Sequence, residues 1–369
     1  MIKIKQTQAN KNVFTSVFDK ENLARAKFKA IDDLFLRNHF LKIFSVHSQK
    51  EKYRKIYSFD NLTDEFLHTQ KFFVKESTFS HYNNIINTHI RPYFNSLNLE
   101  EIDIGSIHNF INEKLSSGRM DGSGGLSNKS VKDISSVLKM IIKYGVSKGL
   151  LRSSLAEFSV PKERKKDIKI LSPEDMRCLE NYVYDLEDSY KLGVYICLYT
   201  GLRIGEICAL QWKDIDFNNK FLNVKKTILR ISDVNSSTTK TKIIIDSPKS
   251  ESSIRVIPLP NKLIEILFLH KQKITNENYY VLTGGEKYIE PRNYYERYKK
   301  YLTNCNIPDY TFHSLRHTFA TRCVEIGFDP KTLSEILGHS DVKITLSRYV
   351  HPSMERKRIC MDKLFDVSI

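Results

Sequence analysis

The chain has 369 residues, more than one typical domain holds, so two or three domains are expected. Hydrophobic residues make up 41% of it and charged residues 27%, which supplies apolar cores and excludes a disordered chain. Lysine and arginine number 58 against 43 aspartates and glutamates, a formal net charge of +15. This excess favours a polyanionic partner such as nucleic acid, because bound phosphates release counterions. A basic surface that serves solubility or an anionic membrane is the alternative.

Patterns that would place the chain outside the cytoplasm are missing from the sequence. The first residues lack the apolar core and small-residue cleavage site of a signal peptide, and no apolar run is long enough to span a bilayer. The six cysteines are scattered without a CxxC pair, which favours reduced, buried thiols over a structural zinc site. A cytoplasmic protein with no membrane partner is therefore expected.

The first 55 residues are basic and aromatic-rich and form a segment of their own. An amphipathic helix is expected over residues 21–44, because Leu23, Ala26 and Ala30 recur at near-helical spacing. A polar tract follows and separates this segment from the next domain.

Four helices are expected between residues 56 and 160. Asn61 and Ser77 are candidate N-caps of the first two, because their side chains can accept bonds from free backbone N–H groups. Pro92 predicts that a new element starts there, and a glycine-rich loop precedes a fourth helix from Ser127. This region is predicted to be a small helical domain.

Residues 161–169 are the predicted interdomain linker. They begin with a proline and contain five basic against two acidic residues. A solvated linker and a contact with a phosphate backbone are both open for this segment.

The remainder of the chain mixes helices and strands. Ser172, followed by a proline and two acids, is a strong helix start. Three runs rich in Val, Ile and Thr predict strands, with a turn between the last two, over residues 221–229, 240–246 and 253–259. Further helices are expected to begin at Asn261, Pro291, Phe312, Pro330 and Ser340. The predicted fold class is mainly α with a small antiparallel β-sheet (α+β).

Two histidines one helical turn apart, His313 and His317, have the spacing of a metal-binding pair. A zinc site is disfavoured, because Ser314 replaces the usual glutamate and Arg316 places a fixed positive charge beside the metal. His313 and Arg316 share nearly one helix face and can present donors to a single anion. His317 is expected mainly to cap or pack the helix.

Four other residues are candidates for chemistry on a phosphodiester. Arg203 lies between two glycines that permit close approach of a phosphate, although a surface arginine near a helix start is common. Lys249 sits in the predicted hairpin turn, from which an ammonium can reach a leaving oxygen; an ordinary solvated lysine is the alternative. His339 follows a predicted helix end. Tyr349 needs donors or a base to act as a nucleophile, because a phenol has a pKa near 10, and most tyrosines are packing residues.

Taken in order, these residues resemble the catalytic set of the tyrosine recombinases, the phage and conjugative-transposon integrase family. The matching set is Arg203, Lys249, His313, Arg316, His339 and Tyr349. Flanking residues also match, as in Thr-Gly-Leu-Arg-Ile-Gly-Glu at 200–206, Arg-Val-Ile-Pro-Leu at 255–259 and Leu-Gly-His-Ser at 337–340. The resemblance covers the catalytic half closely, and the helical region is similar in type to the family's core-binding domain.

The resemblance implies a mechanism that needs no metal, nucleotide or other cofactor. Arg203 and Arg316 would hold the scissile phosphate, His339 would donate a further hydrogen bond, and His313 would accept or donate a proton. Tyr349 would form a 3′-phosphotyrosyl bond.

In the same mechanism Lys249 would protonate the leaving 5′-oxygen. Glu206 is expected to support the first arginine. The covalent link conserves the bond energy, so that the 5′-hydroxyl of a partner strand can reverse the step.

The implied organisation is an N-terminal segment (1–55, arm-site DNA-binding or regulatory), a core-binding domain (56–160), a basic linker (161–169) and a catalytic domain with a C-terminal tail (170–369). The implied partners are double-stranded DNA with specific recombination sites, a homotetramer on synapsed DNA and a candidate accessory DNA-bending or excision protein. In the family a tail such as the one carrying Ile359, Leu364 and Phe365 docks on a neighbouring protomer, and packing on its own domain is the alternative. A nucleoid-associated location follows from action on DNA.

Three other functions stay open from the sequence. A type IB topoisomerase has a similar active site, a chromosome-dimer-resolving recombinase is a shorter relative, and a DNA-binding regulator would never cleave. The flanking residues and the additional N-terminal segment favour the integrase of a mobile element.

Overall fold

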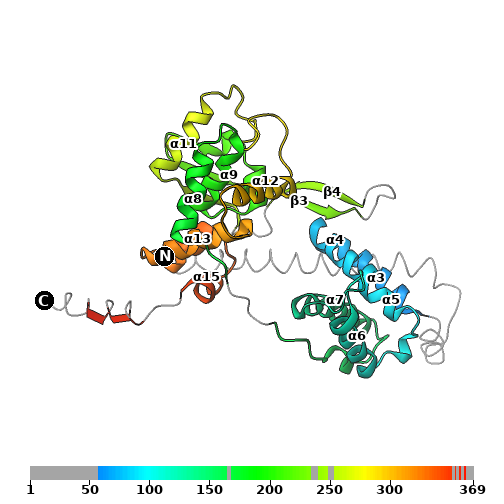
Figure 1. Ribbon diagram of the computed structural model, residues 1–369. Coiled ribbons are helices and arrows are strands. Elements are labelled where there is room, and N and C mark those ends of the chain that lie inside the picture. Colours follow the sequence, from blue (N-terminus) through cyan, green and yellow to red (C-terminus); the bar gives the residue numbers. More distant parts are fainter. Residues whose placement is uncertain are drawn as a thin grey trace, which may run out of the picture. The chain divides into compact units, whose positions relative to one another are not determined.

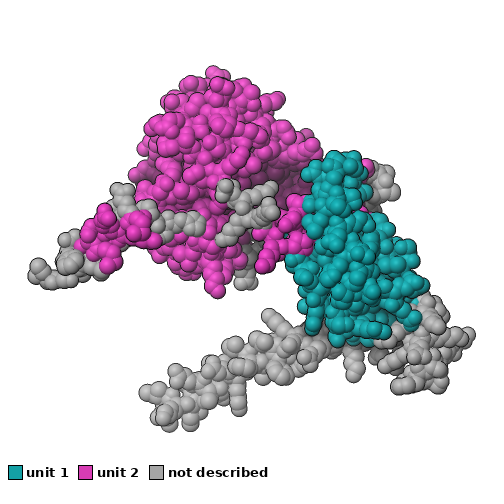
Figure 2. All heavy atoms as spheres, turned by 60° about the horizontal axis from the view of Figure 1, so that its bottom comes forward, with its two compact units in different colours: residues 1–66, 89–126, 133–160 teal, residues 67–88, 127–132, 161–369 magenta. Residues whose placement is uncertain are grey.

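The computed structural model describes residues 57–163, 168–233, 240–247 and 253–350, together with positions 354, 357, 358, 361 and 362. The predicted N-terminal segment, Lys249 and the apolar stripe of the tail lie outside the described residues. The chain divides into two compact units, shown in Figure 2. Of the described residues, 57–66, 89–126 and 133–160 form the first unit, and the others form the second.

The first unit is helical, as the sequence predicts. Aromatic rings fill its core: Phe94 packs against Phe59 and Phe110 with ring centroids 5.1 Å apart in each pair. The helices of this region, two of which extend into the second unit, are α3 (Phe59–Phe73), α5 (Arg91–Phe94), α6 (Ile104–Ser117) and α7 (Asn128–Ser147). Short 3-10 turns cover Leu99–Glu101 and Ser153–Ala156.

Local chemistry shifts two of the predicted helix starts. The first helix is capped by Ser58, whose hydroxyl accepts from the backbone N–H of Asn61, while the Asn61 side chain accepts from the N–H of Ser58. Ser58 is therefore the N-cap, and Asn61, three positions later, is the other member of this reciprocal pair and not the cap itself. The next helix, α4 (Glu76–Ile85), has Lys75 at its N-cap position, so the prediction of Ser77 was wrong by two residues.

A new element starts around Pro92, as expected. The π-helical turn (Ile86–Ile90) that follows α4 ends there, and Pro92 lies in the first turn of α5. A proline is tolerated at this position because first-turn N–H groups have no intrahelical acceptor.

The second unit combines helices with two small antiparallel sheets, one of which, β3–β4, extends as a two-stranded ribbon beside α4 in Figure 1. Helix α9 is buried along almost its whole length and contacts α13. The helices are α8 (Pro173–Tyr184), α9 (Leu192–Thr200), α10 (Ile204–Ala209), α11 (Asn261–Lys271), α12 (Pro291–Asn304), α13 (Phe312–Glu325), α14 (Pro330–Leu337) and α15 (Val342–Tyr349). The predicted starts at Pro173, Asn261, Pro291, Phe312 and Pro330 are confirmed, and α15 is capped by Asp341 and not by Ser340.

The strands pair differently from the sequence prediction. The strands are β1 (Ile215–Asp216), β2 (Phe221–Val224), β3 (Thr227–Ser232), β4 (Thr241–Asp246) and β5 (Arg255–Pro258). One sheet has the order β1-β2-β5, and β3 and β4 form a separate two-stranded sheet. The single run predicted over 221–229 thus contains two strands of different sheets, and β4 and β5 are not hairpin partners. Alternating burial identifies a strand but does not specify its partner.

Helix α4 belongs to the second unit through its contacts with the β3–β4 sheet. The Ser80 hydroxyl donates to the carbonyl of Ser232 at 2.9 Å, and the Lys75 ammonium donates to the carbonyl of Ser247 at 2.9 Å. Lys242 of β4 pairs with Glu76 at 2.6 Å. Because the compact units interleave along the chain, the domain boundaries at 56–160 and 170–369 stay a prediction.

The cysteines and the hydropathy of the helices can also be compared with the sequence predictions. Of the cysteines in the described ranges, Cys197, Cys208 and Cys323 are buried free thiols, whereas Cys178 is exposed. Among the described helices, none is both long and apolar enough to cross a lipid bilayer.

Candidate active site

Two helix ends bring the predicted residues of the site together. Gly201 ends α9 and Gly338 ends α14, both in the left-handed conformation, with φ of 66° and 65°. A Cβ on Gly201 would lie 2.6 Å from Cδ1 of Phe319, and one on Gly338 would lie 3.0 Å from Nη1 of Arg255. Both positions need glycine, because a side chain would strain the backbone and collide with the site.

The carbonyl groups at these helix ends hold both predicted arginines. Arg316 Nη1 donates to the Gly201 oxygen at 2.7 Å, and Nη2 donates to the Leu337 oxygen at 2.9 Å. Arg203 Nη2 donates to the Gly338 oxygen at 3.2 Å. Residues more than a hundred positions apart are thus fixed at one place by main-chain acceptors.

The two arginines differ in their access to solvent. The Arg203 side chain is 38% exposed, whereas Arg316 is only 1% exposed. Burial, followed by the charge of Arg203, lowers the pKa of Arg316 to about 9, so it is still a cation at neutral pH. A guanidinium has five N–H groups, so the two bonds of Arg316 to carbonyls leave further donors for an anion.

An arginine cluster built on one carboxylate (Arg203, Glu206 and Arg255) forms the first half of the site. Glu206 Oε1 accepts from Arg203 at 2.8 Å, and Oε2 accepts from Arg255 at 3.0 Å. The expected support of Arg203 by Glu206 is confirmed. Burial alone raises the pKa of Glu206, but the charges and hydrogen bonds of Arg255 and Arg203 outweigh it, and the pKa is lowered. The carboxylate is therefore ionised.

Arg255 is a part of the site that sequence reasoning did not assign. It is 9% exposed on β5 and also donates through Nε to the carbonyl of Ile336 at 2.6 Å. A buried arginine in a strand needs a carboxylate partner, but nothing in the sequence identifies Glu206 as that partner.

A histidine–tyrosine cluster (His313, His317, His339 and Tyr349) forms the second half. His317 Nδ1 lies 2.7 Å from the Tyr349 hydroxyl, and the rings of His313 and His317 meet edge to face at 4.5 Å. The His339 ring stacks near Tyr349, with centroids 6.5 Å apart, and its Nδ1 lies 2.8 Å from the buried hydroxyl of Thr345. Tyr349 itself is 6% exposed.

All three imidazoles of this cluster are neutral near pH 7. Desolvation, then the charge of Arg348, lowers the pKa of His317 to about 4. Desolvation, then Arg316, lowers the pKa of His339 to about 3. Desolvation, then the charge of His317, also lowers the pKa of His313 to about 3. Burial raises the pKa of Tyr349 despite the nearby arginines, so the phenol is protonated.

Comparison with known proteins identifies the chain. The model of the phage integrase family matches residues 169–356, and the N-terminal SAM-like domain of phage integrases matches residues 58–115. The chain belongs to the phage integrase family. It is an integrase of the tyrosine recombinase type.

Relatives of this integrase include proteins of mobile elements. It is 30% identical over 270 residues to a XerC-like tyrosine recombinase of Caldanaerobacter subterraneus, covering 66% of this chain and 68% of that protein. It is 28% identical to the ICEBs1 integrase of Bacillus subtilis over 86% of each chain.

Solved structures of other integrases have the same fold. The Tn1549 transposon integrase in complex with transposon right end DNA matches with a TM-score of 0.68 and 21% identity, over 84% of this chain and all of that one. A λ integrase tetramer bound to a Holliday junction matches with a TM-score of 0.59 and 17% identity, over 90% of this chain and 88% of that one.

The structure of the integrase brings together five of the six predicted site residues. The sixth, Lys249, lies outside the described residues. Lys249 was expected in a hairpin turn between β4 and β5, but these two strands belong to different sheets and do not form a hairpin. His317, expected mainly to cap or pack its helix, contacts the Tyr349 hydroxyl; its position one helical turn from His313 was the signal.

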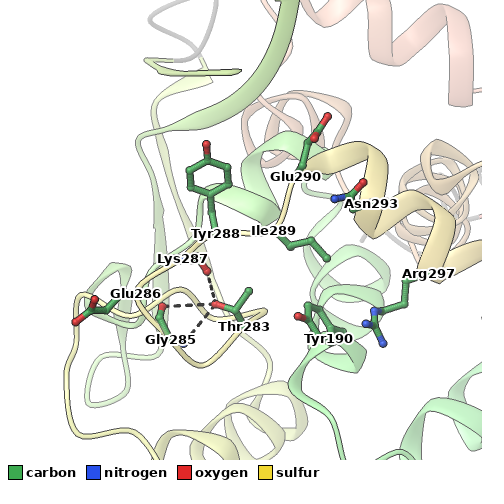
Figure 3. Close-up of a pocket in the computed structure, with 10 residues that line it drawn as sticks. All are labelled: Tyr190, Thr283, Gly285, Glu286, Lys287, Tyr288, Ile289, Glu290, Asn293 and Arg297. Carbon is green, nitrogen blue, oxygen red and sulfur yellow. Dashed lines mark hydrogen bonds between the residues drawn. The ribbon is translucent and has the colours of Figure 1, made fainter. Parts of the chain in front are cut away.

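The integrase also has a surface pocket apart from these residues, shown in Figure 3. It is formed by the loop before α12 and the start of that helix, where Thr283 accepts and donates bonds with the backbone of its own loop and Arg297 lies over the ring of Tyr190 at 4.0 Å. None of the predicted site residues lines it. In the described ranges no group of three or more His, Cys, Asp or Glu side chains could hold a metal ion.

Proposed function

We propose that this integrase cleaves and rejoins DNA strands through a 3′-phosphotyrosyl link to Tyr349. The observation that carries the proposal is the convergence of two arginines, a neutral histidine and the tyrosine on one place. Arg203 and Arg316 are fixed by carbonyls of the two helix ends, and Tyr349 lies at the end of α15 beside the His339 ring. No residue of this set requires a cofactor for nucleophilic attack on a phosphodiester.

In this proposal the arginines stabilise the charge that develops on the phosphate. Arg203 has the more accessible guanidinium, and its carboxylate partner fixes its orientation before DNA arrives. Arg316 contributes the N–H groups that its two carbonyl acceptors leave free. Preorganised donors of this kind stabilise the transition state because they need no reorganisation during the reaction.

In the proposed reaction His339 donates a hydrogen bond, and His313 and Lys249 transfer protons. With Nδ1 of His339 accepting from Thr345, its Nε2–H is the donor directed to a phosphate oxygen. His313 accepts or donates a proton near the phosphate, and Lys249 protonates the leaving 5′-oxygen. The 5′-hydroxyl of a partner strand then attacks the phosphotyrosine and releases Tyr349.

The proposed partners are specific recombination sites on double-stranded DNA, other copies of this chain in a homotetramer, and an accessory DNA-bending or excision protein. The Tn1549 and λ integrases, whose solved complexes contain transposon DNA and a Holliday junction, support the DNA part of this proposal. Tail residues Met354 and Met361 are 76% and 62% exposed, which supports docking of the tail on a neighbouring copy. Residues 1–55 would bind arm sites or regulate, and the location would be cytoplasmic and nucleoid-associated.

The basic linker is proposed to contact the phosphate backbone. Of this segment, Lys162 accepts a bond from Asn128 through its carbonyl, and Glu163 pairs with Lys132 at 3.7 Å. Replacing the five basic residues of 161–169 by glutamine should weaken binding to all DNA sequences and flatten the dependence on salt. Unchanged affinity would mean that the linker is merely solvated.

The direct test is to incubate the protein with fragmented host and element DNA, denature it and sequence whatever stays covalently attached. Adducts at one recurring sequence, absent from Tyr349→Phe, are expected. Tyr298→Phe is the matched control, because it removes a buried hydroxyl that has no hydrogen-bond partner among the described residues.

Two results would contradict the proposal. Adducts scattered over all sequences would contradict the specific recombination sites and indicate a topoisomerase. Tight, salt-dependent binding without adducts, equal for the parent protein and Tyr349→Phe, would indicate a DNA-binding regulator.

A further inference from the structure

The buried tyrosine of the site is held by a histidine that the proposed mechanism does not use. Nδ1 of His317 lies 2.7 Å from Oη of Tyr349, a normal distance for a hydrogen bond between a hydroxyl and a ring nitrogen. The two residues belong to α13 and α15, which are in contact. The phenol must lose a proton when its oxygen attacks phosphorus, so the identity of its neighbour matters.

The protonation state of the phenol makes it a donor for this hydrogen bond. Burial raises the pKa of Tyr349 more than the charges of Arg316 and Arg348 lower it, so the phenol keeps its proton at neutral pH. A protonated phenol can donate to a ring nitrogen that carries a lone pair. In that arrangement, which the inference requires, His317 is the tautomer with its proton on Nε2.

The charges around His317 keep it ready to accept a proton. Burial and the positive charges of Arg348 on α15 and Arg316 on α13 lower its pKa to about 4, so the imidazole is neutral at neutral pH and one ring nitrogen has a free lone pair. His313, edge to face with it, is neutral as well. A DNA phosphate bound at the arginines would offset these positive charges and raise the affinity of His317 for a proton.

We infer that His317 is a catalytic residue: it orients the hydroxyl of Tyr349 and takes up its proton as Oη attacks the scissile phosphorus. The bond between Oη and phosphorus forms while the bond to the 5′-oxygen breaks. The phenol proton moves to Nδ1 of His317, and the leaving oxygen takes a proton from Lys249. In rejoining, the imidazolium returns the proton to Tyr349. His313 stays available to the phosphate. The inference rests on the proposed role of Tyr349.

The experiment measures single-turnover formation of the covalent adduct on a nicked duplex that carries the cleavage sequence found in the adduct sequencing. His317→Ala should slow adduct formation about 100-fold, the low end for loss of a general base, with unchanged DNA affinity. His317→Asn places an amide oxygen near the position of Nδ1, so it can hold the hydroxyl but cannot take its proton. It should be nearly as slow as the alanine variant.

A more acidic phenol separates proton uptake from orientation. Site-specific replacement of Tyr349 by difluorotyrosine lowers the pKa of the phenol and should restore much of the rate of His317→Ala, with a much smaller effect beside an intact His317. His270→Ala is the matched control, since His270 is a partly buried histidine on α11, outside the site. Thermal unfolding of each variant checks that it is folded.

The outcomes distinguish this inference from the proposed function. Parent-like rates for both His317 variants would overturn it, while adducts that depend on Tyr349 would leave the proposed function intact. A parent-like rate for His317→Asn alone would reduce His317 to orientation and overturn proton uptake. If His317→Ala does not fold, His317→Asn with difluorotyrosine at position 349 decides in the same way. No adducts from the parent protein would count against the proposed function itself.

Discussion

The arginine cluster and the histidine–tyrosine cluster differ in how their charged groups are paired. In the arginine cluster, Glu206 neutralises part of the charge of Arg203 and Arg255 inside the protein. In the histidine–tyrosine cluster, hydroxyls and neutral imidazoles bind one another, and the nearby Arg316 donates only to carbonyls in the described structure. Glu206 thus leaves one net positive charge in the first half, and the charge of Arg316 lies beside a second half whose imidazoles and phenol are neutral. A bound phosphate would compensate charge in both places.

The largest effect is expected where the internal compensation is removed. Glu206→Gln keeps the shape of the side chain but leaves two arginines without their carboxylate, and breaking a buried pair in this way costs about 3–5 kcal/mol. We expect a loss of this order in the free energy of unfolding, measured by urea denaturation.

The control for this variant is Glu174→Gln. Glu174 pairs with Arg177 at 3.1 Å, but both side chains are largely exposed. Its loss should be within about 1 kcal/mol. Similar losses for the two variants would contradict a dominant role for the buried carboxylate.

The second prediction tests the helix end that joins the two halves. Gly201→Ala forces a side chain into the left-handed conformation and against Phe319, which should cost about 2–4 kcal/mol from backbone strain and overpacking together. Gly284→Ala is the comparison, since Gly284 has φ of 64° but only ordinary contacts, the nearest at 3.4 Å. Its cost should be about 1–2 kcal/mol, from backbone strain alone. Equal costs would show that Phe319 moves aside freely.

The third prediction separates orientation from stability in the histidine–tyrosine cluster. Thr345→Val removes the hydroxyl that bonds His339 and keeps the buried shape. We expect adduct formation to fall about tenfold, as when a residue that orients a functional histidine is lost. Thr63→Val is the control: Thr63 is also fully buried, but its hydroxyl bonds the carbonyl of Phe59 within its own helix. A parent-like rate for Thr345→Val would mean that the His339 ring is held by packing alone.

The last prediction concerns pH. The folded-state pKa of His317 is about 4 and those of His313 and His339 are about 3, all below the value near 6.5 of an unfolded chain. Between these values the unfolded state binds more protons, so stability should fall as pH drops from about 6.5 towards 4. Urea midpoints at several pH values should give a shallower slope for His317→Asn.

His108→Asn, at an exposed position on α6, should retain the slope of the parent protein. A parent-like slope for His317→Asn would mean that the pKa of His317 is the same in the folded and the unfolded protein.

Much of the local structure could be predicted because its causes are local. Ser172 accepts from the N–H of Asp175 as a cap should, and Gly338 ends its helix in the left-handed conformation. The types and order of the site residues also identified the family. These features depend on a few neighbouring residues, which the sequence displays together.

Other features depend on segments far apart in the chain, and only the tertiary structure decided them. Strand alternation predicted strands but could not specify that Leu222 pairs with Ile257, because every apolar strand face is satisfied by several partners. Burial of Arg255 against Glu206 brings β5 and α10 together, and the contact of His317 with Tyr349 brings α13 and α15 together. The sequence by itself therefore determined which chemical groups this integrase has, and packing decided which of them are paired inside the protein and which are left for DNA.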